Sequence, residues 1–560
     1  MESGSELSGA RLLVEALVVN KVDRVFCVPG ESYLSVLDAL HDRRGSIQTI
    51  TCRQEGGAAM MAEADGKLTG RPGIAMVTRG PGATNASAGV HVAFQDSTPM
   101  ILFIGQVGRG FMDREAFQEI DYRRMFGELA KWVGQIDEAA RVPEYVARAF
   151  AVATSGRPGP VVLALPEDML DDLATAGELR PVTPREIYPG EAQMAELEGM
   201  LRESRRPLLV IGGSRWDSYS TARIQEFARA NDLPVVATFR RQDRFDNADP
   251  CYVGEIGVAV NPKLRARVQE ADLLIVLGAR LGEMTTGGYS LLNIPVPHQK
   301  MIHIHAGAEE LGRVYQPDLA INATPRGFAS LLPTVSPGSS SAPWSAWRRS
   351  ARADYEHWQE PVAVSGPLQM AEIVCWLRDT LPEDAIITNG AGNFATWVHR
   401  FHRYRRLGTQ LAPTSGSMGY GYPAAVAAKL RYPDRTVVCV AGDGDIMMTG
   451  QELATAMQYD AAVVLIVVDN AMYGTIRMHQ ERHFPTRTHA TDLRNPDFVL
   501  LAQAYGAYGE RVDTTEAFAP AFERASTAGR PAVLHLKLDQ EALTTSQSLS
   551  QIRAAALAAR

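Results

Sequence analysis

The segment Val437-Val-Cys-Val-Ala-Gly-Asp-Gly-Asp445 indicates the fold most clearly, because a run of small and β-branched apolar residues ends abruptly in glycine and aspartate. Such a run is typical of a buried strand, and glycine lets a ligand approach the backbone closely. A second apolar run, Ala462–Val468, leads directly into Asp469-Asn-Ala-Met-Tyr-Gly474. Because the carboxyl ends of parallel strands meet at one edge of an open α/β sheet, we expect Asp443 and Asn470 to face one crevice.

The same two segments suit a diphosphate and a hard cation. A helix after Gly442-Asp-Gly444 can present its amino end to phosphate oxygens. A cation that bridges a carboxylate, an amide oxygen and two phosphate oxygens matches the octahedral preference of Mg²⁺. The tripeptide alone is more often an ordinary turn after a strand. The spacing of 25 residues between Gly444 and Asn470 favours the binding interpretation.

Outward from this segment, short apolar runs alternate with longer stretches of helical period, as in parallel sheets with crossover helices. We therefore predict an α/β protein of three consecutive doubly wound parallel-sheet domains at residues 1–185, 190–335 and 355–545, with a tail at 546–560. The length of 560 residues agrees with three or four domains. The strands expected are Arg24–Val28, Ile74–Thr78, Met100–Ile104, Pro160–Leu165, Pro207–Gly212, Pro234–Thr238, Asp272–Gly278, Lys300–His305, Ala385–Thr388, Thr436–Ala441, Ala462–Val468 and Ala532–Lys537.

Polar, proline-containing stretches separate these blocks. Residues 171–189 and 333–342 are predicted linkers, the second being rich in proline, serine and glycine. The alanine-rich stretch Ser550–Arg560 is predicted to form a terminal helix.

The composition is that of a globular protein, with 46% hydrophobic and 21% charged residues. A net charge of −8 provides no general attraction for nucleic acid or an anionic membrane, so small-molecule chemistry is favoured. The five cysteines show no C-x-x-C spacing, no signal peptide is recognised and no apolar run could span a bilayer. We expect a cytoplasmic protein with no nucleic-acid or membrane partner.

The two segments resemble the cofactor motif of the superfamily of thiamine diphosphate enzymes that includes acetohydroxyacid (acetolactate) synthases, pyruvate oxidases and 2-oxo acid decarboxylases. The resemblance implies thiamine diphosphate and Mg²⁺, bound by pyrimidine-binding and diphosphate-binding domains on either side of a central domain. It implies that Asp443, Asn470 and the backbone carbonyl of Met472 hold the metal. The cofactor-binding residues that it implies in the third domain are Gly392, Asn393, Phe394, Met418, Gly442, Gly444, Asp445, Tyr473 and Gly474.

Two N-terminal segments extend the resemblance. Thr51-Cys-Arg-Gln-Glu55 resembles the family's Arg-His-Glu segment, with Gln54 in place of histidine, and implies that Glu55 is the catalytic hydrogen-bond partner of N1′ of the aminopyrimidine. A lone glutamate at a helix start is otherwise a surface residue favoured by the helix dipole. The loop Val77–Asn85 also resembles the family, with Arg79 in place of serine. Because the family divides its site between subunits, a homodimer at minimum, and a homotetramer, are expected.

The segment Glu115-Ala-Phe-Gln-Glu119 resembles acetohydroxyacid synthases in particular. This resemblance favours decarboxylation of a 2-oxo acid followed by attack of the acyl carbanion on a second carbonyl compound. It places Gln118 among the catalytic residues, and the substrate pocket that it implies contains Gly30, Phe117, Gln118, Ile476 and His479. Two positions depart from the synthases, since their substrate-selecting tryptophan aligns with His479 and their second-substrate arginine aligns with Met284.

Three alternatives stay open. Val25–Leu34 resembles a loop of pyruvate decarboxylases and aligns their catalytic aspartate with Glu31, so a decarboxylase that releases an aldehyde is the first alternative. Glu31 is equally well interpreted as a helix-start carboxylate without a chemical role. A non-catalytic ligand-binding relative is the second alternative. The third concerns FAD, which the central domain leaves open but does not predict, because His305 and Gly307 occupy the acidic positions of the flavoenzymes.

Overall fold

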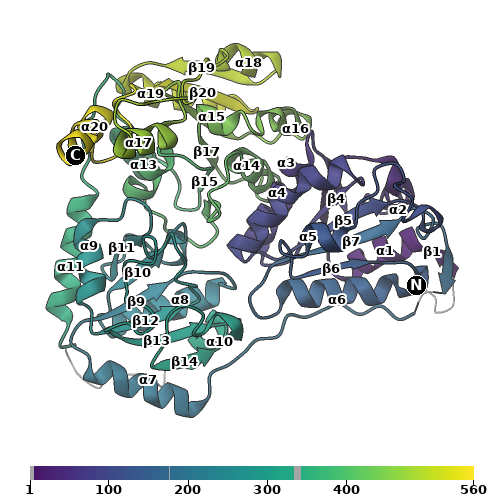
Figure 1. Cartoon of the computed structure of the whole chain (residues 1–560), viewed down its shortest axis with the longest axis horizontal. Coiled ribbons are helices and arrows are strands. Elements are labelled where there is room, and N and C mark those ends of the chain that lie inside the picture. Colours follow the sequence, from purple (N-terminus) through teal and green to yellow (C-terminus); the bar gives the residue numbers. More distant parts are fainter. Residues whose placement is uncertain (1–5, 176, 333–341) are drawn as a thin grey trace. The chain divides into compact units, whose positions relative to one another are not determined.

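The computed structural model describes residues 6–175, 177–332 and 342–560. Three six-stranded parallel sheets, each flanked by helices, follow one another along the chain (Figure 1). This confirms the predicted fold class. The chain divides into two compact units, an N-terminal unit of residues 1–185, 426–431 and 449–459, and a C-terminal unit of residues 186–425, 432–448 and 460–560. Of the predicted linker at 333–342, all but the last residue lie outside the described residues.

The first sheet belongs to the N-terminal unit and has the strand order β3-β2-β4-β5-β7-β6. Its strands are β2 (Arg24–Cys27), β3 (Gln48–Thr51), β4 (Gly73–Val77), β5 (Met100–Gln106), β6 (Trp132–Gln135) and β7 (Pro160–Pro166). Its helices are α1 (Gly9–Val19), α2 (Leu34–Asp42), α3 (Glu55–Thr69), α4 (Pro81–Asp96), α5 (Tyr122–Phe126) and α6 (Val142–Thr154). The predicted linker at 171–189 contains a strand, since β8 (Leu173–Thr175) pairs antiparallel with β1 (Glu6–Ser8).

The second sheet has the order β11-β10-β9-β12-β13-β14. Its strands are β9 (Pro207–Ile211), β10 (Val235–Thr238), β11 (Tyr252–Ile256), β12 (Leu273–Leu277), β13 (Lys300–His305) and β14 (Leu319–Asn322). The helices around it are α7 (Glu191–Glu203), α8 (Ser218–Ala230), α9 (Pro262–Glu270), α10 (Pro325–Ala329) and α11 (Ser345–Trp358). Helix α11 packs onto this sheet through Ala351 and Tyr355, which are buried in its two hydrophobic clusters.

The third sheet has the order β16-β15-β17-β18-β20-β19. Its strands are β15 (Ile386–Asn389), β16 (Gln410–Leu411), β17 (Val437–Gly442), β18 (Val464–Asp469), β19 (Tyr508–Val512) and β20 (Ala532–Lys537). The helices of this region are α12 (Met370–Thr380), α13 (Phe394–Phe401), α14 (Gly421–Arg431), α15 (Asp443–Ile446), α16 (Leu453–Gln458), α17 (Gly474–His483), α18 (Phe498–Ala504), α19 (Thr515–Thr527) and α20 (Leu549–Ala558). The last of these confirms the predicted terminal helix.

The neighbouring strands β17 and β18 determine where the predicted metal ligands lie. Gly442 pairs with Val468 in their parallel register. The chain therefore leaves the two strands at the same edge of the sheet, with Asp443 following one strand and Asn470 following the other. This is the crevice that the sequence predicts at the carboxyl ends of parallel strands.

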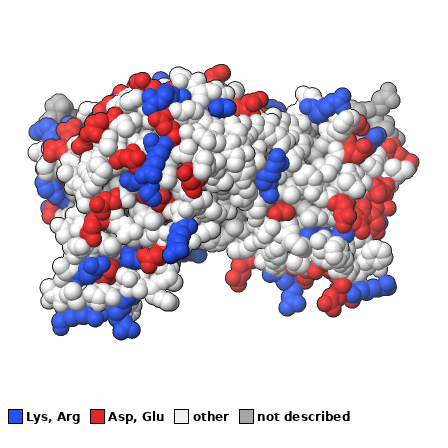
Figure 2. All heavy atoms as spheres, turned by 90° about the horizontal axis from the view of Figure 1, so that it is seen from above, with Lys and Arg blue, Asp and Glu red and all other residues white. Residues whose placement is uncertain are grey.

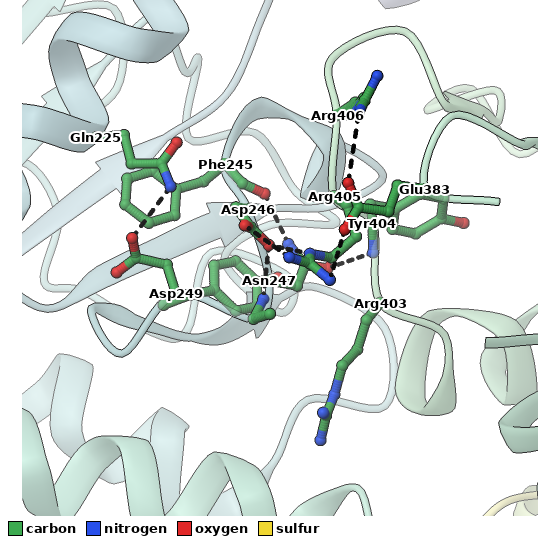
Figure 3. Close-up of polar contacts among 12 residues, drawn as sticks. Gln225, Phe245, Asp246, Asn247, Asp249, Glu383, Arg403, Tyr404, Arg405 and Arg406 are labelled. Atoms are coloured by element: carbon green, nitrogen blue, oxygen red, sulfur yellow. Dashed lines mark hydrogen bonds and ion pairs between the residues drawn. The ribbon is translucent and has the colours of Figure 1, made fainter. Parts of the chain in front are cut away.

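Within the C-terminal unit, a loop of the second sheet is bound to the segment before β16 (Figure 3). The N–H of Asn247 donates to the carbonyl of Tyr404 at 2.9 Å, and the N–H of Tyr404 donates to Asn247 Oδ1 at 3.0 Å. Arg405 Nε donates to Asp246 Oδ1 at 2.6 Å and also forms an ion pair with Glu383. Main-chain pairing, reinforced by charge, thus connects the second and third sheets.

The apolar character of the helices and the distribution of surface charge bear on membrane and nucleic-acid partners. Among the described residues, no helix has both the length and the apolar character needed to cross a membrane. On the face shown in Figure 2, acidic and basic side chains are interspersed over most of the surface.

Candidate functional site

A cavity of about 240 Å³ lies at the carboxyl ends of β15, β17 and β18. It collects predicted residues from segments that are distant in the sequence. Those that line it are Gly392, Asn393, Phe394, Met418, Gly442, Asp443, Gly444, Asp445, Asn470, Met472, Tyr473, Gly474 and Ile476. The sheet topology therefore brings the predicted cofactor and metal residues of the third domain around one space.

Three helices begin at this cavity. The N-cap residues of α13, α15 and α17 are Asn393, Gly442 and Tyr473, and none of them makes a side-chain capping bond. At α13 and α17, helix starts without a side-chain cap leave backbone N–H groups for another acceptor, and the helix dipole adds partial positive charge. In α15 the N–H of Gly444 already donates to Asp443 Oδ1. The arrangement suits an anion such as a diphosphate.

The cavity wall requires glycine at two positions. A Cβ atom on Gly444 would lie 2.7 Å from the ring of Tyr473, and one on Gly442 would lie 2.8 Å from the ring of Phe394. Real Cβ atoms do not approach other atoms so closely, so these glycines allow the two aromatic rings to form part of the wall.

The predicted metal ligands offer a set of oxygen donors. Asp443 is buried, and burial raises the pKa of its carboxyl to about 6. A bound cation would favour the ionised form of this carboxylate. Asn470 Oδ1 accepts a long hydrogen bond of 3.3 Å from the N–H of Met472. A carboxylate, an amide oxygen and a backbone carbonyl fit a hard cation whose other ligands are phosphate oxygens and water.

This donor set differs from a metal site formed by side chains alone. Among the residues that the structure describes, no group of three or more histidine, cysteine, aspartate or glutamate side chains could hold a metal ion. The predicted site contains only one such side chain, Asp443, so it depends on the diphosphate for further ligands.

Asp445 lines the cavity and joins two of its loops. Its Oδ1 accepts hydrogen bonds from the N–H of Ala391 at 3.1 Å and the N–H of Gly419 at 2.9 Å. Burial raises the pKa of its carboxyl to about 7. The side chain therefore ties the loop that leads to Gly392 to the loop that carries Met418.

Glu55 is the first residue of α3 in the N-terminal unit, and Asn85 Nδ2 donates to its Oε2 at 2.9 Å. Gln54, which replaces the family's histidine, caps the same helix because its Oε1 accepts from the N–H of Gly57 at 2.9 Å. The buried Glu452 accepts from the N–H of Gln54 at 2.9 Å. Glu452 was not predicted from the sequence, since no recognisable motif surrounds it.

Phe117 and Gln118 lie in a loop of the same unit. Phe117 has 71% of its surface exposed, and Gln118 has a left-handed backbone with φ of +66°. Arg79 Nε donates to the carbonyl of Phe117 at 3.2 Å, while its Nη1 donates to Glu167 Oε2 at 2.8 Å. The arginine that departs from the family pattern thus holds the loop that carries the predicted substrate residues.

A glycine turn connects this loop to Glu55. A Cβ atom on Gly80 would lie 2.7 Å from the Cβ of Gln118, and one on Gly82 would lie 3.3 Å from Glu55 Oε1. The predicted catalytic residues Glu55 and Gln118 therefore lie against the same short turn at the start of α4.

Gly30 and Glu31 lie in the same unit, and Gly30 is close to this turn because Thr78 is a neighbour of both Gly30 and Gly82. Glu31 is exposed and contributes, with Leu34 and Phe111, to a hollow of about 560 Å³. Gly30 packs on Thr78, whose side chain would be 2.5 Å from an added Cβ. The catalytic role of Glu31 stays a prediction.

The two predicted pocket residues on α17 differ in position. Ile476 lines the cavity and has 54% of its surface exposed. His479 is exposed, does not line the cavity, and stacks on His483 with ring centroids 6.2 Å apart. A substrate contact by His479 stays a prediction.

Two glycines of the central domain are required by the packing of that domain itself. A Cβ on Gly213 would lie 1.8 Å from the carbonyl oxygen of Gly278, and one on Gly212 would lie 2.0 Å from Thr238 Oγ1. These glycines allow neighbouring strand ends to approach each other, which requires no flavin.

Comparison with known proteins agrees with this arrangement. Three family descriptions match the chain, namely the N-terminal TPP binding domain of thiamine pyrophosphate enzymes at residues 7–125, their central domain at 194–332 and their C-terminal TPP binding domain at 390–536. The chain is 32% identical to acetolactate synthase isozyme 2 large subunit of Escherichia coli (strain K12), over 95% of this chain and 96% of that protein. It is also 32% identical to the acetolactate synthase large subunit of Parasynechococcus marenigrum, over 91% and 84% of the two chains.

The chain therefore belongs to the thiamine pyrophosphate (thiamine diphosphate) enzyme family and is an enzyme that depends on this cofactor. Within the family, its relatives include acetolactate synthase large subunits at about 30% identity, among them a probable one of Methanocaldococcus jannaschii at 29%. Neither these comparisons nor the structure indicate FAD.

Proposed function

We propose that the enzyme decarboxylates a 2-oxo acid and joins the remaining acyl unit to the carbonyl carbon of a second compound, as an acetolactate synthase does. The observation that carries this proposal is the cavity where Asp443, Asn470 and three helix starts without side-chain caps converge. The acetolactate synthase relatives support carboligation as the reaction that ends the cycle.

The residues of the cavity bind the cofactor in this proposal. When bound, thiamine diphosphate supplies a nucleophilic ring carbon and accepts the electron pair that carbon dioxide leaves behind. Asp443, Asn470 and the carbonyl of Met472 would hold Mg²⁺. The N–H groups at the starts of α13 and α17 donate to diphosphate oxygens, and Met418 supports the thiazolium ring.

The N-terminal unit contributes proton transfer and substrate contacts. Glu55, oriented by Asn85, holds a proton at N1′ of the aminopyrimidine. Phe117 and Gln118, together with Gly30, orient the second carbonyl compound. Exclusion of water by Phe117 favours attack on that carbonyl over protonation.

Incubation of the enzyme with thiamine diphosphate, Mg²⁺ and pyruvate, followed by assays for acetolactate, acetoin and acetaldehyde, tests the proposal. We expect a 2-hydroxy ketone or acetolactate, and Glu55→Gln should lose most of the turnover because proton transfer at N1′ fails. Acetaldehyde as the sole product would instead identify a simple decarboxylase. If a panel of 2-oxo acids releases no carbon dioxide, the proposed decarboxylation is wrong.

The proposal includes a homodimer, which can assemble into a homotetramer, acting in the cytoplasm. Three apolar side chains of the N-terminal unit are largely exposed, with exposed fractions of 61% for Leu34, 59% for Phe111 and 71% for Phe117. Leu34 and Phe111 line one hollow, and apolar side chains that gather in a patch are typical of a subunit contact. All five cysteines are free and buried, which supports a reducing compartment.

A further inference from the structure

Asn495 connects two buried carboxylates in the C-terminal unit. Its Nδ2 donates to Asp443 Oδ2 at 2.7 Å and to Asp469 Oδ1 at 2.9 Å. Asp443 and Asp469 are 3% and 1% exposed, and they follow or end the neighbouring strands β17 and β18. The amide therefore donates one hydrogen bond to each of the two carboxylates.

The charge of Asp469 is compensated on its other side. His535 Nε2 lies 2.8 Å and Lys537 Nζ 2.7 Å from Asp469 Oδ2, and both side chains come from β20. The N–H of Ala471 donates to Asp469 Oδ1 at 2.9 Å. The position of Asp469 is therefore fixed and its charge is compensated by His535 and Lys537. The negative charge of Asp443 stays available to a cation.

Asn495 reaches Asp443 from outside the cofactor cavity. It does not line that cavity but lines a separate hollow of about 640 Å³ together with Asp469, His535 and Lys537. Its segment is held beside the metal turn, since the N–H of Leu493 donates to the carbonyl of Ala471 at 2.9 Å. Asn495 forms these hydrogen bonds without contacting the cofactor cavity.

The hydrogen bonds also define the orientation of Asp443. Its Oδ1 accepts from the N–H of Gly444 at 3.0 Å, and its Oδ2 accepts from Asn495. Each carboxylate oxygen keeps a second lone pair for a metal. Without Asn495, two carboxylates would face each other with no donor between them, and Asp443 could rotate away from the cavity.

We propose that Asn495 is a positioning residue for the metal, which fixes Asp443 in its coordinating orientation by anchoring it to the Asp469–His535–Lys537 cluster. This inference rests on the proposed metal role of Asp443. Residues that orient a metal ligand in this way typically contribute 10- to 100-fold to metal affinity.

Titration of Mg²⁺ into the full-length protein with saturating thiamine diphosphate, followed by tryptophan fluorescence, tests the inference. We expect Asn495→Ala to weaken Mg²⁺ binding by about 10- to 100-fold, while kcat at saturating Mg²⁺ stays close to that of the wild type. With Mn²⁺ as the probe, the electron paramagnetic resonance line shape should change in Asn495→Ala, because the ligand geometry is altered.

The matched control is Gln503→Ala, which removes an exposed amide from α18, the helix after Asn495. In EDTA without cofactor both proteins should be folded by circular dichroism, with a lower thermal midpoint in Asn495→Ala because two buried carboxylates lose their shared donor. If Asn495→Ala does not fold, Asn495→Ser, which keeps one donor, replaces it and should show an intermediate loss. Unchanged Mg²⁺ affinity in a folded Asn495 variant overturns the inference.

Asp443→Ala separates this inference from the proposed function. We expect it to abolish Mg²⁺-dependent cofactor binding. Wild-type Mg²⁺ binding in Asp443→Ala would refute the proposed metal site itself. Loss of binding in Asp443→Ala, combined with unchanged binding in Asn495→Ala, would refute only the role of Asn495.

Discussion

At the scale of single residues, two positions of the N-terminal unit where the sequence departs from its family have identifiable structural partners. Gln54 caps α3 through the N–H of Gly57. Arg79 donates to the carbonyl of Phe117 and to Glu167. Each departure changes how a predicted site residue is supported, and neither removes that residue.

Arg79→Met tests the support of the predicted substrate loop. The methionine keeps the length of the side chain but cannot donate to Phe117 or Glu167, so Phe117 and Gln118 should lose their fixed position. Because a displacement of about 1 Å in a site can cost up to about 100-fold in rate, we expect kcat/KM for the 2-oxo acid to fall by about 10- to 100-fold. Steady-state kinetics measure this change, and we expect most of it to appear as a higher KM.

Arg114→Met is the matched control, since Arg114 is an exposed arginine of the same loop. It should leave kcat/KM near the wild-type value. Equal kinetics in Arg79→Met and Arg114→Met would show that the Arg79 bonds do not position the loop.

At the scale of elements, the strands predicted from the sequence are the four inner strands of each sheet. Those strands are buried almost throughout, as in the wholly buried β5, β12 and β17. Strands covered on both faces require continuous apolar runs, which are easily recognised. The strands of these three sheets that were missed are the six edge strands, namely β3, β6, β11, β14, β16 and β19, and the short pair β1 and β8 was missed as well.

The edge strands were missed for a physical reason. β19 (Tyr508–Val512) contains glycine, glutamate and arginine and is mostly half-buried or exposed, and β16 is only two residues long. An edge strand pairs on one side only and can carry polar residues, so its sequence resembles that of a loop. Pairing with an inner strand, which is a tertiary contact, determines that such a segment becomes a strand.

The edge strand β11 also carries a carboxyl that should make stability depend on pH. Burial raises the pKa of Glu255 from 4.5 to about 8, although the N–H of Arg240 donates to it. Between these values the folded protein holds a proton that the unfolded chain releases. Stability should therefore fall as the pH rises from 5 to 8, by at most about 1.4 kcal/mol per pH unit.

Glu255→Gln should remove this slope because glutamine resembles the protonated carboxyl. We expect its thermal midpoint to exceed that of the wild type by an amount that grows from pH 5 to pH 8. Glu270→Gln, at the exposed end of α9, is the control and should give a constant difference. Parallel curves for Glu255→Gln and the wild type would contradict the prediction.

At the scale of the whole molecule, the proposed division of the site between subunits can be tested by complementation. Glu55→Gln and Asp443→Ala proteins should each be inactive. In a mixed dimer, one site would carry both changes and the other would carry neither. After subunit exchange we therefore expect about a quarter of the wild-type activity, since random pairing of the two chains makes half of the dimers mixed and each mixed dimer has one intact site.

The activity of the mixture of Glu55→Gln and Asp443→Ala proteins should appear only after their subunits have exchanged. Mixing at a temperature or time that prevents exchange is the control and should give no recovery. If complete exchange, verified by mass spectrometry of differently tagged chains, still gives no activity, each site uses Glu55 and Asp443 of the same subunit.

The sequence by itself determined the fold class, the inner strands of each sheet and the family. These depend on local signals, since apolar runs and motifs such as Gly442-Asp-Gly444 are contiguous in the chain. Tertiary structure alone decided which residues support the site. Asn495 and Glu452 show no motif, and their contacts with Asp443 and Gln54 span 52 and 398 residues of sequence. A hydrogen bond depends on distance in space, so residues that act only through another side chain become recognisable once the chain is folded.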